Sequence, residues 1–252
     1  MCVLMCGITS ATAQEYNGTG GLLHVPSADT DAPGTFRGYA YFLGKQFTPT
    51  QLQQGGEKYN TFSYGVGVTV FSWLELSYQA ALLKMEKYGN AGDPIGYYNE
   101  DRHVNIKLRP LKEGKWWPAI ALGWDDVGRW ASMKTGNNLN NYFQNLYIVG
   151  TKHFDIRGHQ LGAHLAYRYY TTNRNKKHTG IAGGITYTPR IGESLQDPKA
   201  WLQRPRFIVE WDGTGVNVGA DVLLWRHLFV QAAFVHGCGF TGGLGYHYTI
   251  PF

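Results

Sequence analysis

The strongest constraint on the fold is the C-terminal stretch, residues 239–252, which reads GFTGGLGYHYTIPF. Counting back from Phe252, every second residue is apolar or aromatic except Gly242, whereas the residues between them are small or polar apart from Pro251. Because side chains on a strand alternate between its two faces, this pattern predicts a strand with one apolar and one polar face. A terminal aromatic strand is typical of an outer-membrane β-barrel, although the last strand of a soluble sandwich shows the same alternation.

Composition favours the barrel over the soluble sandwich. Charged residues make up 16% of the 252 residues and aromatic residues 15%, whereas about 25% of a soluble domain is charged. No run of about 18 apolar residues occurs, which argues against membrane-spanning helices. The net charge is +5, but no basic helix or zinc-finger spacing accompanies it. We therefore expect a basic lumen or basic rims, and no nucleic-acid partner.

The first residues are typical of an export signal. Residues 1–14 carry no charge and end in Ala11-Thr12-Ala13, which matches a cleavage-site pattern. We expect residues 1–14 to be a signal peptide without its basic beginning, so that the mature chain starts near Gln14 or Glu15. Cys238 is then the one cysteine left, which excludes an intrachain disulfide and a cysteine metal site.

Strand-like segments follow one another through the rest of the chain with hardly any helical periodicity. In Thr61–Phe71, for example, Tyr64 and Val66 share a face that excludes Ser63 and Gly65. The twelve predicted strands are Thr35–Leu43, Thr61–Phe71, Trp73–Leu83, Arg102–Arg109, Pro118–Val127, Asn141–Phe154, Gln160–Tyr170, Gly180–Thr188, Arg206–Trp211, Val216–Leu224, Leu228–Val235 and Gly239–Phe252.

The connections between these strands alternate in length. If the N-terminus is periplasmic, the first, third, fifth and seventh connections face outward, and all four are long and polar. The second, fourth, sixth and tenth are short, as periplasmic turns of outer-membrane barrels are. The eighth connection is longer than this rule predicts, and the ninth and eleventh are shorter. We therefore predict a transmembrane antiparallel β-barrel of about 12 strands at residues 35–252, in the outer membrane of a Gram-negative bacterium.

In such a barrel the apolar face contacts lipid and the polar face lines the lumen. We expect paired charges to close the lumen, or else to line a narrow path for sugars or anions. On the C-terminal strand, an aromatic and apolar insertion signal would be recognised by the barrel-assembly machinery. The predicted lumen-facing set is Arg37, Glu75, His103, Lys107, Arg109, His164, Arg168, Glu210, Asp221 and His247, and the insertion signal is Tyr246, Tyr248, Ile250 and Phe252.

The sequence shows no catalytic constellation. It contains no Gly-x-Ser-x-Gly motif, and Asp125 and Asp126 are adjacent, so that in a strand without a bulge they point to opposite faces. The possible metal ligands are single histidines without a carboxylate at fixed spacing, namely His103, His153, His159, His164, His178 and His247. We therefore expect no enzyme activity, no cofactor and no metal.

The most distinctive block precedes the first predicted strand, in an N-terminal arm at residues 15–34. Gly18–Ala28 reads GTGGLLHVPSA, and DAPGTFRG follows at Asp31–Gly38. These residues resemble the start of the YjbH-like outer-membrane proteins, which carry a G-x-x-G-L-(x)-x-x-P-S-A block. Weaker similarity at Leu108–Trp117, Val149–Phe154 and Asp212–Leu228 points to short, Bacteroidetes-type members. The resemblance implies an outer-membrane β-barrel linked to exopolysaccharide production, without catalytic residues.

The arm motif consists of Gly21, Leu22, Leu23, Pro26, Ser27 and Ala28. Its apolar residues require burial, which three arrangements provide: a plug inside the barrel, a contact with a periplasmic partner, or a short extra strand or arm packed at the rim. We hypothesise that the protein is a YjbH-like barrel that assists surface-polysaccharide export or serves as the barrel subunit of an envelope complex. Its partners would be outer-membrane lipid and other envelope proteins or a polysaccharide. The alternative is a narrow channel selective for sugars or anions.

Overall fold

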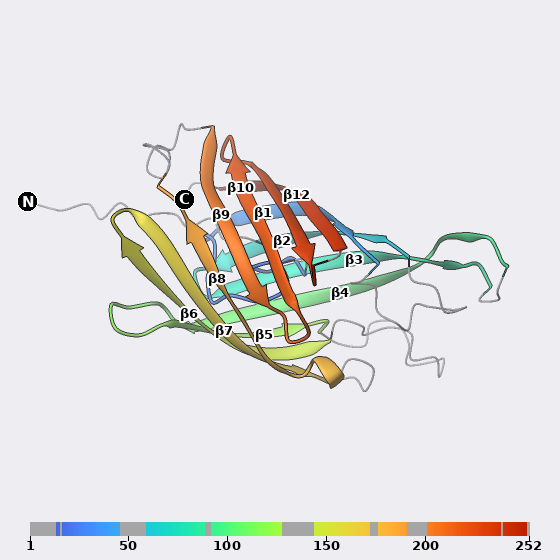
Figure 1. Cartoon of the computed structure of the whole chain (residues 1–252), viewed down its shortest axis with the longest axis horizontal. Helices are drawn as coiled ribbons and strands as arrows, with labels where there is room; N and C mark the ends of the chain where they lie inside the picture. Colours follow the sequence, from blue (N-terminus) through green and yellow to red (C-terminus); the bar gives the residue numbers. More distant parts are fainter. Residues whose placement is uncertain are drawn as a thin grey trace, which may run out of the picture.

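The computed structural model is a closed antiparallel barrel of twelve strands, in which each strand pairs with its sequence neighbours and β1 pairs with β12 (Figure 1). It describes residues 14–15, 17–45, 59–88, 92–127, 144–171, 176–190, 201–237 and 239–250. A 3₁₀ turn, η2 (Lys176–His178), lies between β7 and β8. The strands are β1 Thr35–Leu43, β2 Thr61–Phe71, β3 Leu74–Glu86, β4 Ile95–Leu111, β5 Ala119–Asp125, β6 Asn145–Ile156, β7 His159–Tyr170, β8 Gly180–Thr188, β9 Leu202–Trp211, β10 Val216–Leu224, β11 Leu228–Val235 and β12 Gly239–Thr249.

The predicted fold class and strand number are confirmed, but several strand bounds were wrong. β3 and β4 continue past their predicted ends, and Lys84 pairs with Tyr97 after a register shift. Most of the connection predicted at residues 84–101 is therefore a paired hairpin, which extends beyond the other strands (Figure 1). The shift breaks the two-residue alternation, which is why the pattern ended early. β9 likewise begins at Leu202, and Phe252 lies outside the described residues.

The two faces of the wall are inverted relative to a soluble fold. On β7, Leu165 is 65% exposed on the outer face. Inside, the side chains of Lys107 on β4 and Glu75 on β3 are both 0% exposed. An apolar exterior around a polar interior suits a barrel surrounded by lipid, because lipid cannot hydrate charged groups. No described helix is long and apolar enough to cross a bilayer.

Exposed aromatic side chains gather near both ends of the wall. We call the end that carries Thr35 and Thr249 the terminal end, and the opposite end the loop end. Trp and Tyr at the two rims are characteristic of membrane-water interfaces. Near the terminal end these residues are Phe71, Trp73, Trp116, Trp117, Trp201, Trp225 and Tyr248, and near the loop end they are Phe62, Tyr97, Trp124, Tyr169, Trp211 and Phe240.

The C-terminal strand has the predicted alternation. Tyr246, Tyr248 and Ile250 are exposed on the outer side, whereas His247 is buried on the inner side. β12 pairs with β11 on one edge and with β1 on the other, so that it closes the barrel. The strand that carries the predicted insertion signal therefore has no free edge in the folded state.

Charge on the outer face tests whether lipid surrounds the barrel. Leu165→Arg lies near the middle of β7, where we expect a cost of about 2–4 kcal/mol in folding free energy measured in lipid bilayers. Ile156→Arg, at the terminal end of β6, is the matched control and should cost at most about 1 kcal/mol, because arginine reaches the interface there. Equal costs at both positions would contradict a membrane-spanning wall.

Candidate functional site

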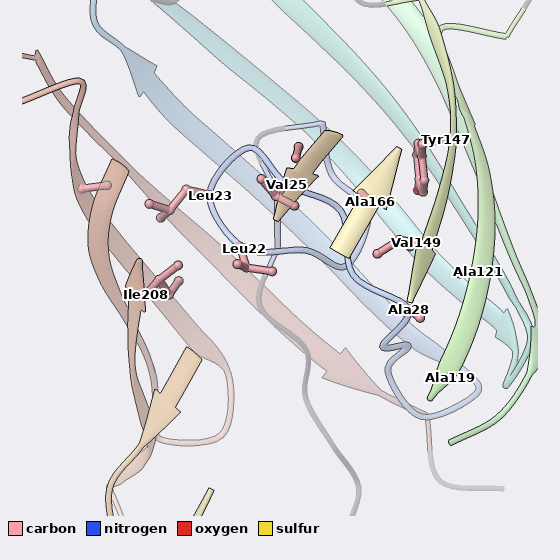
Figure 2. Packing of buried hydrophobic residues seen from close by; sticks show 12 residues of the cluster. Leu22, Leu23, Val25, Ala28, Ala119, Ala121, Tyr147, Val149, Ala166 and Ile208 are labelled. Carbon is pink, nitrogen blue, oxygen red and sulfur yellow. The ribbon is translucent and has the colours of Figure 1, made fainter. Parts of the chain in front are cut away.

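The arm lies inside the barrel, where it occupies the lumen (Figure 2). Leu22, Leu23, Val25 and Ala28 are buried and form one apolar cluster with inward-facing wall residues. The wall contributes Ala119, Ala121, Tyr147, Val149, Ala166, Ala182, Ile208 and Ala233. Of the three arrangements that the sequence left open, the structure has the plug.

A tight turn presents the two leucines to the wall. Gly21 forms a bridge with Pro26, and the Leu22 amide donates to the Val25 carbonyl oxygen at 2.8 Å. The wall is recessed opposite this turn, because a Cβ atom at Gly184 of β8 would lie 2.5 Å from Leu22 Cδ2. A side chain at this wall position would therefore collide with the arm.

Glu210 on β9 binds the tip of the turn. Its carboxylate accepts hydrogen bonds from the backbone N–H groups of Leu23 at 3.0 Å, His24 at 2.9 Å and Val25 at 3.2 Å. Three successive N–H groups directed at one anion form an anion-binding nest. Asn217 Nδ2 also donates to Glu210 at 2.9 Å, and Arg168 Nη1 donates to the His24 carbonyl oxygen at 2.8 Å. The turn therefore has partners for both its amides and its carbonyl groups.

A second group of charges binds the arm at Gly20 and Asp29, the residues that flank the motif. Lys107 Nζ lies 2.6 Å from Glu75 Oε2, and Arg37 Nη2 lies 3.5 Å from Glu75 Oε1. Lys107 and Glu75 also bind the arm backbone: Lys107 donates to the carbonyl oxygens of Gly20 at 3.0 Å and Asp29 at 2.6 Å, while Glu75 accepts from the Gly20 amide at 3.1 Å. The charges pair along one side of the wall, where Glu75 and Lys107 lie opposite each other on neighbouring strands, and they hold the arm at the same time.

The rest of the motif is bound through its backbone and its hydroxyl group. The Ser27 amide donates to the Gly20 carbonyl oxygen at 3.3 Å, and Ser27 Oγ accepts from the Asp29 amide at 3.2 Å. The Ala28 amide donates to Thr151 Oγ1 of β6 at 2.9 Å. The Pro26-Ser27-Ala28 segment thus closes the turn and leads the chain along the wall.

The structure buries every residue of the predicted lumen-facing set except Arg109. Arg109 is only partly buried, and its Nη2 donates to the Ser72 carbonyl oxygen at 2.6 Å, at the terminal end. Asp221 pairs with Arg206 at 2.8 Å, and His247 stacks on Phe229. His103 is buried on β4. The set therefore lines the interior, with one member at the rim.

Sequence reasoning missed the neutral polar residues that bind the arm. Asn105 and Ser77 both donate to the Asn17 carbonyl oxygen, at 2.6 Å and 3.1 Å, and Gln231 donates to the Leu22 carbonyl oxygen at 3.2 Å. All three wall residues lie on the polar face of their strands, so the two-residue alternation places them inside the barrel. Amide and hydroxyl side chains are also common on exposed strand faces, so these residues do not stand out in the sequence as buried charges do.

Two pairs of residues lie differently from what the sequence predicts. The histidines predicted to be scattered singly include His153 on β6 and His164 on β7, whose ring centroids lie 5.8 Å apart. Asp125 and Asp126, expected on opposite faces, are both buried. Asp126 lies just past the end of β5 with φ of 58°, so that the chain has left the strand there and the alternation no longer applies.

Asp126 belongs to an acidic group at the loop end. Burial, together with the negative charges of Asp101 and Asp125, raises the pKa of Asp126 to about 8. Asp125 accepts from Asn17 at 3.2 Å and from Asn145 at 3.0 Å, which connects this group to the start of the arm. Asp101, Asp125 and Asp126 thus form an acidic group at the loop end, whereas Lys107, which binds the arm, lies deeper in the barrel.

A comparison with protein-family models places these features in context. The YjbH family model, described as exopolysaccharide biosynthesis protein YbjH, matches residues 13–179. The chain belongs to the YjbH family. The matched region covers the arm and β1–β7. No curated protein matches the chain. Assignment to short, Bacteroidetes-type members remains a prediction.

Replacing Glu210 tests whether the wall holds the arm of this YjbH-family barrel. We expect Glu210→Gln to accelerate amide hydrogen exchange at Leu23, His24 and Val25 at least tenfold, because hydrogen bonds to a charged acceptor contribute about 1.5–3 kcal/mol. The matched control is Glu100→Gln on β4, whose carboxylate binds Tyr64 and Arg102 and should leave these amides unchanged. Unaltered protection in Glu210→Gln would contradict the assigned role.

Asp126 gives a pH-dependent prediction. Its folded pKa of about 8 exceeds the ordinary value of about 3.9, so ionisation increasingly favours unfolding as the pH rises between these values. Asp126→Asn removes this cost, and asparagine also tolerates a positive φ. We expect the variant to raise the unfolding temperature more at pH 8 than at pH 5. The same gain at both pH values would show that burial does not hold the proton.

Proposed function

We propose that this YjbH-family protein is a non-enzymatic outer-membrane barrel that assists the export or assembly of a surface exopolysaccharide, or forms the barrel subunit of an envelope complex. The observation that carries the proposal is the occupied lumen: wall charges bind the arm through its own backbone. The family description supports the link to exopolysaccharide. The apolar exterior with aromatic rims supports a place in the outer membrane.

The energetics of the lumen favour a structural role over permeation. A hydrogen bond to a charged group contributes about 1.5–3 kcal/mol, and several buried charges of the wall form such bonds with the backbone of the arm. Glu75, Lys107 and Glu210 would each lose backbone contacts if the arm left. A resting protein of this kind is a closed unit, suited to contact other envelope components at its ends.

The alternative function is a narrow channel for anions or sugars. The observation that favours it is the charge of the wall where the arm lies. Lys107, Arg168 and Arg206 donate to carbonyl oxygens of the arm, and they would line the lumen if the arm withdrew. Cationic side chains on the wall of a narrow pore select for anions. In this case a partner or a ligand would have to displace the arm.

Conductance in planar bilayers tests the closed state. We expect the intact protein to give no steady ohmic current, because the arm fills the lumen, and a variant that lacks residues 15–30 to give stepwise conductance. Heat-modifiable gel migration confirms that both proteins are folded. A steady current through the intact protein that Arg168→Ala or Arg109→Ala alters would favour the channel instead. Co-purification of a stoichiometric envelope partner in mild detergent would support the subunit role.

A further inference from the structure

Three possible metal ligands converge where the arm leaves the lumen. Asp29 belongs to the arm, His153 to β6 and His164 to β7. One ligand atom from each lies within 4.8 Å of the others, and Asp29 Oδ2 is 3.7 Å from His153 Nε2. The site is distinct from the groups that bind the turn, and neither the family description nor the proposed function accounts for it.

Strand register explains how the two imidazoles meet. Thr151 pairs with His164, and His153 pairs with Gly162 on the neighbouring strand, so the histidines are diagonal neighbours on the inner face. A Cβ atom at Gly162 would lie 2.8 Å from His164 Nε2 and 3.1 Å from His153 Cδ2. The glycine therefore leaves free the space that the two rings share.

Glu113 orients His153 in the way that carboxylates orient metal-binding histidines. Its Oε2 lies 2.8 Å from His153 Nδ1, and its Oε1 accepts from the His153 amide at 2.9 Å. With Nδ1–H donating to Glu113, the Nε2 lone pair is directed to the side of Asp29. This arrangement of carboxylate, histidine and ion is the usual one around protein metal sites. Lys152 Nζ donates to Glu113 Oε1 at 2.8 Å and so fixes the carboxylate.

His164 is held by hydroxyl groups. Thr151 Oγ1 lies 3.1 Å from Nδ1, and Thr186 Oγ1 lies 3.2 Å from Nε2. A hydroxyl rotates to donate or to accept, so either nitrogen can be given up to an ion while the other keeps its partner. The Ala28 amide donates to Thr151 Oγ1, which places the residue before Asp29 against the same wall position.

We propose that Asp29, His153 and His164 bind one divalent transition-metal ion, with Zn²⁺ as the best fit, and that the ion fastens the arm to the barrel wall. Two imidazoles and one carboxylate form a familiar zinc set, with water as a fourth ligand. The side chains of Asp29 and His153 are 19% and 22% exposed, so ion and water have access. Zinc-ligand distances of about 2.0–2.2 Å require ligand atoms roughly 3.3 Å apart, a contraction within reach of side-chain rotation.

The test is zinc binding by the full-length protein folded in detergent, measured by calorimetry. We expect one ion per chain with micromolar or tighter affinity, and at least a tenfold loss in His153→Ala, His164→Ala and Asp29→Asn. Glu113→Gln should weaken binding about 10–100-fold. The control is His236→Ala, which removes a histidine paired with Asp212 at 2.9 Å near the loop end and should bind zinc normally. Wild-type protein that binds no zinc, or no more than a double variant with both His153→Ala and His164→Ala, would overturn the proposal.

A second measurement keeps the proposal testable if a variant does not fold. In the wild type, Zn²⁺ should protect His153 and His164, but not His236, from acylation by diethylpyrocarbonate mapped by mass spectrometry. Co²⁺ in place of Zn²⁺ should give the intense visible absorption of a tetrahedral site. Equal modification with and without zinc would show that Asp29 and His153 form an ordinary ion pair.

Discussion

The structure depends on the need to satisfy the backbone of a chain segment enclosed in the lumen. Within the described part of the arm, two isolated bridges and a few local hydrogen bonds satisfy some backbone groups, and other amides and carbonyl groups find their partners on the wall. A buried, unpaired backbone group costs about 1–3 kcal/mol. Wall side chains supply the partners: Glu210 accepts three amides, while Lys107, Arg168, Asn105 and Gln231 donate to carbonyl groups. The position of the arm therefore depends on the polar side chains of the wall, and the burial of those side chains depends on the arm.

The same constraint explains why so many charges are tolerated inside. Charges isolated from water are costly unless they are paired and hydrogen-bonded. Glu75 lies between Lys107 and Arg37 and also accepts an arm amide. The wall and the arm each supply some of the ion pairs and hydrogen bonds that stabilise these charges. If the arm left the lumen, the charges would lose the hydrogen bonds that the arm provides. The arm and the charges of the wall are therefore coupled in the structure.

The arm also connects two parts of the barrel. The family match covers the arm and β1–β7, which include Glu75 and Lys107. Glu210 and Asn217, which bind the tip of the turn, lie on β9 and β10, beyond the matched residues. The inferred metal site combines Asp29 of the arm with His153 on β6 and His164 on β7, all within the match. The arm thus contacts strands on opposite sides of the lumen. The YjbH motif lies between them, in the centre of the fold.

The sequence by itself determined the strand number and, where the alternation is regular, the polar face of a strand, because a period of two is local and survives small errors in strand bounds. Asn105 and Gln231 could have been added from the same pattern. Alternation alone did not decide which face is outside, because it is identical whether lipid or a core covers the apolar side. Composition and connection lengths predicted the orientation, and the tertiary structure placed the charged side chains inside. It alone placed Leu22 and Leu23 in the lumen, where wall glycines make room. It also brought Asp29 to His153 and His164, since their proximity depends on strand register and on the path of the arm, and neither of these is encoded in local spacing.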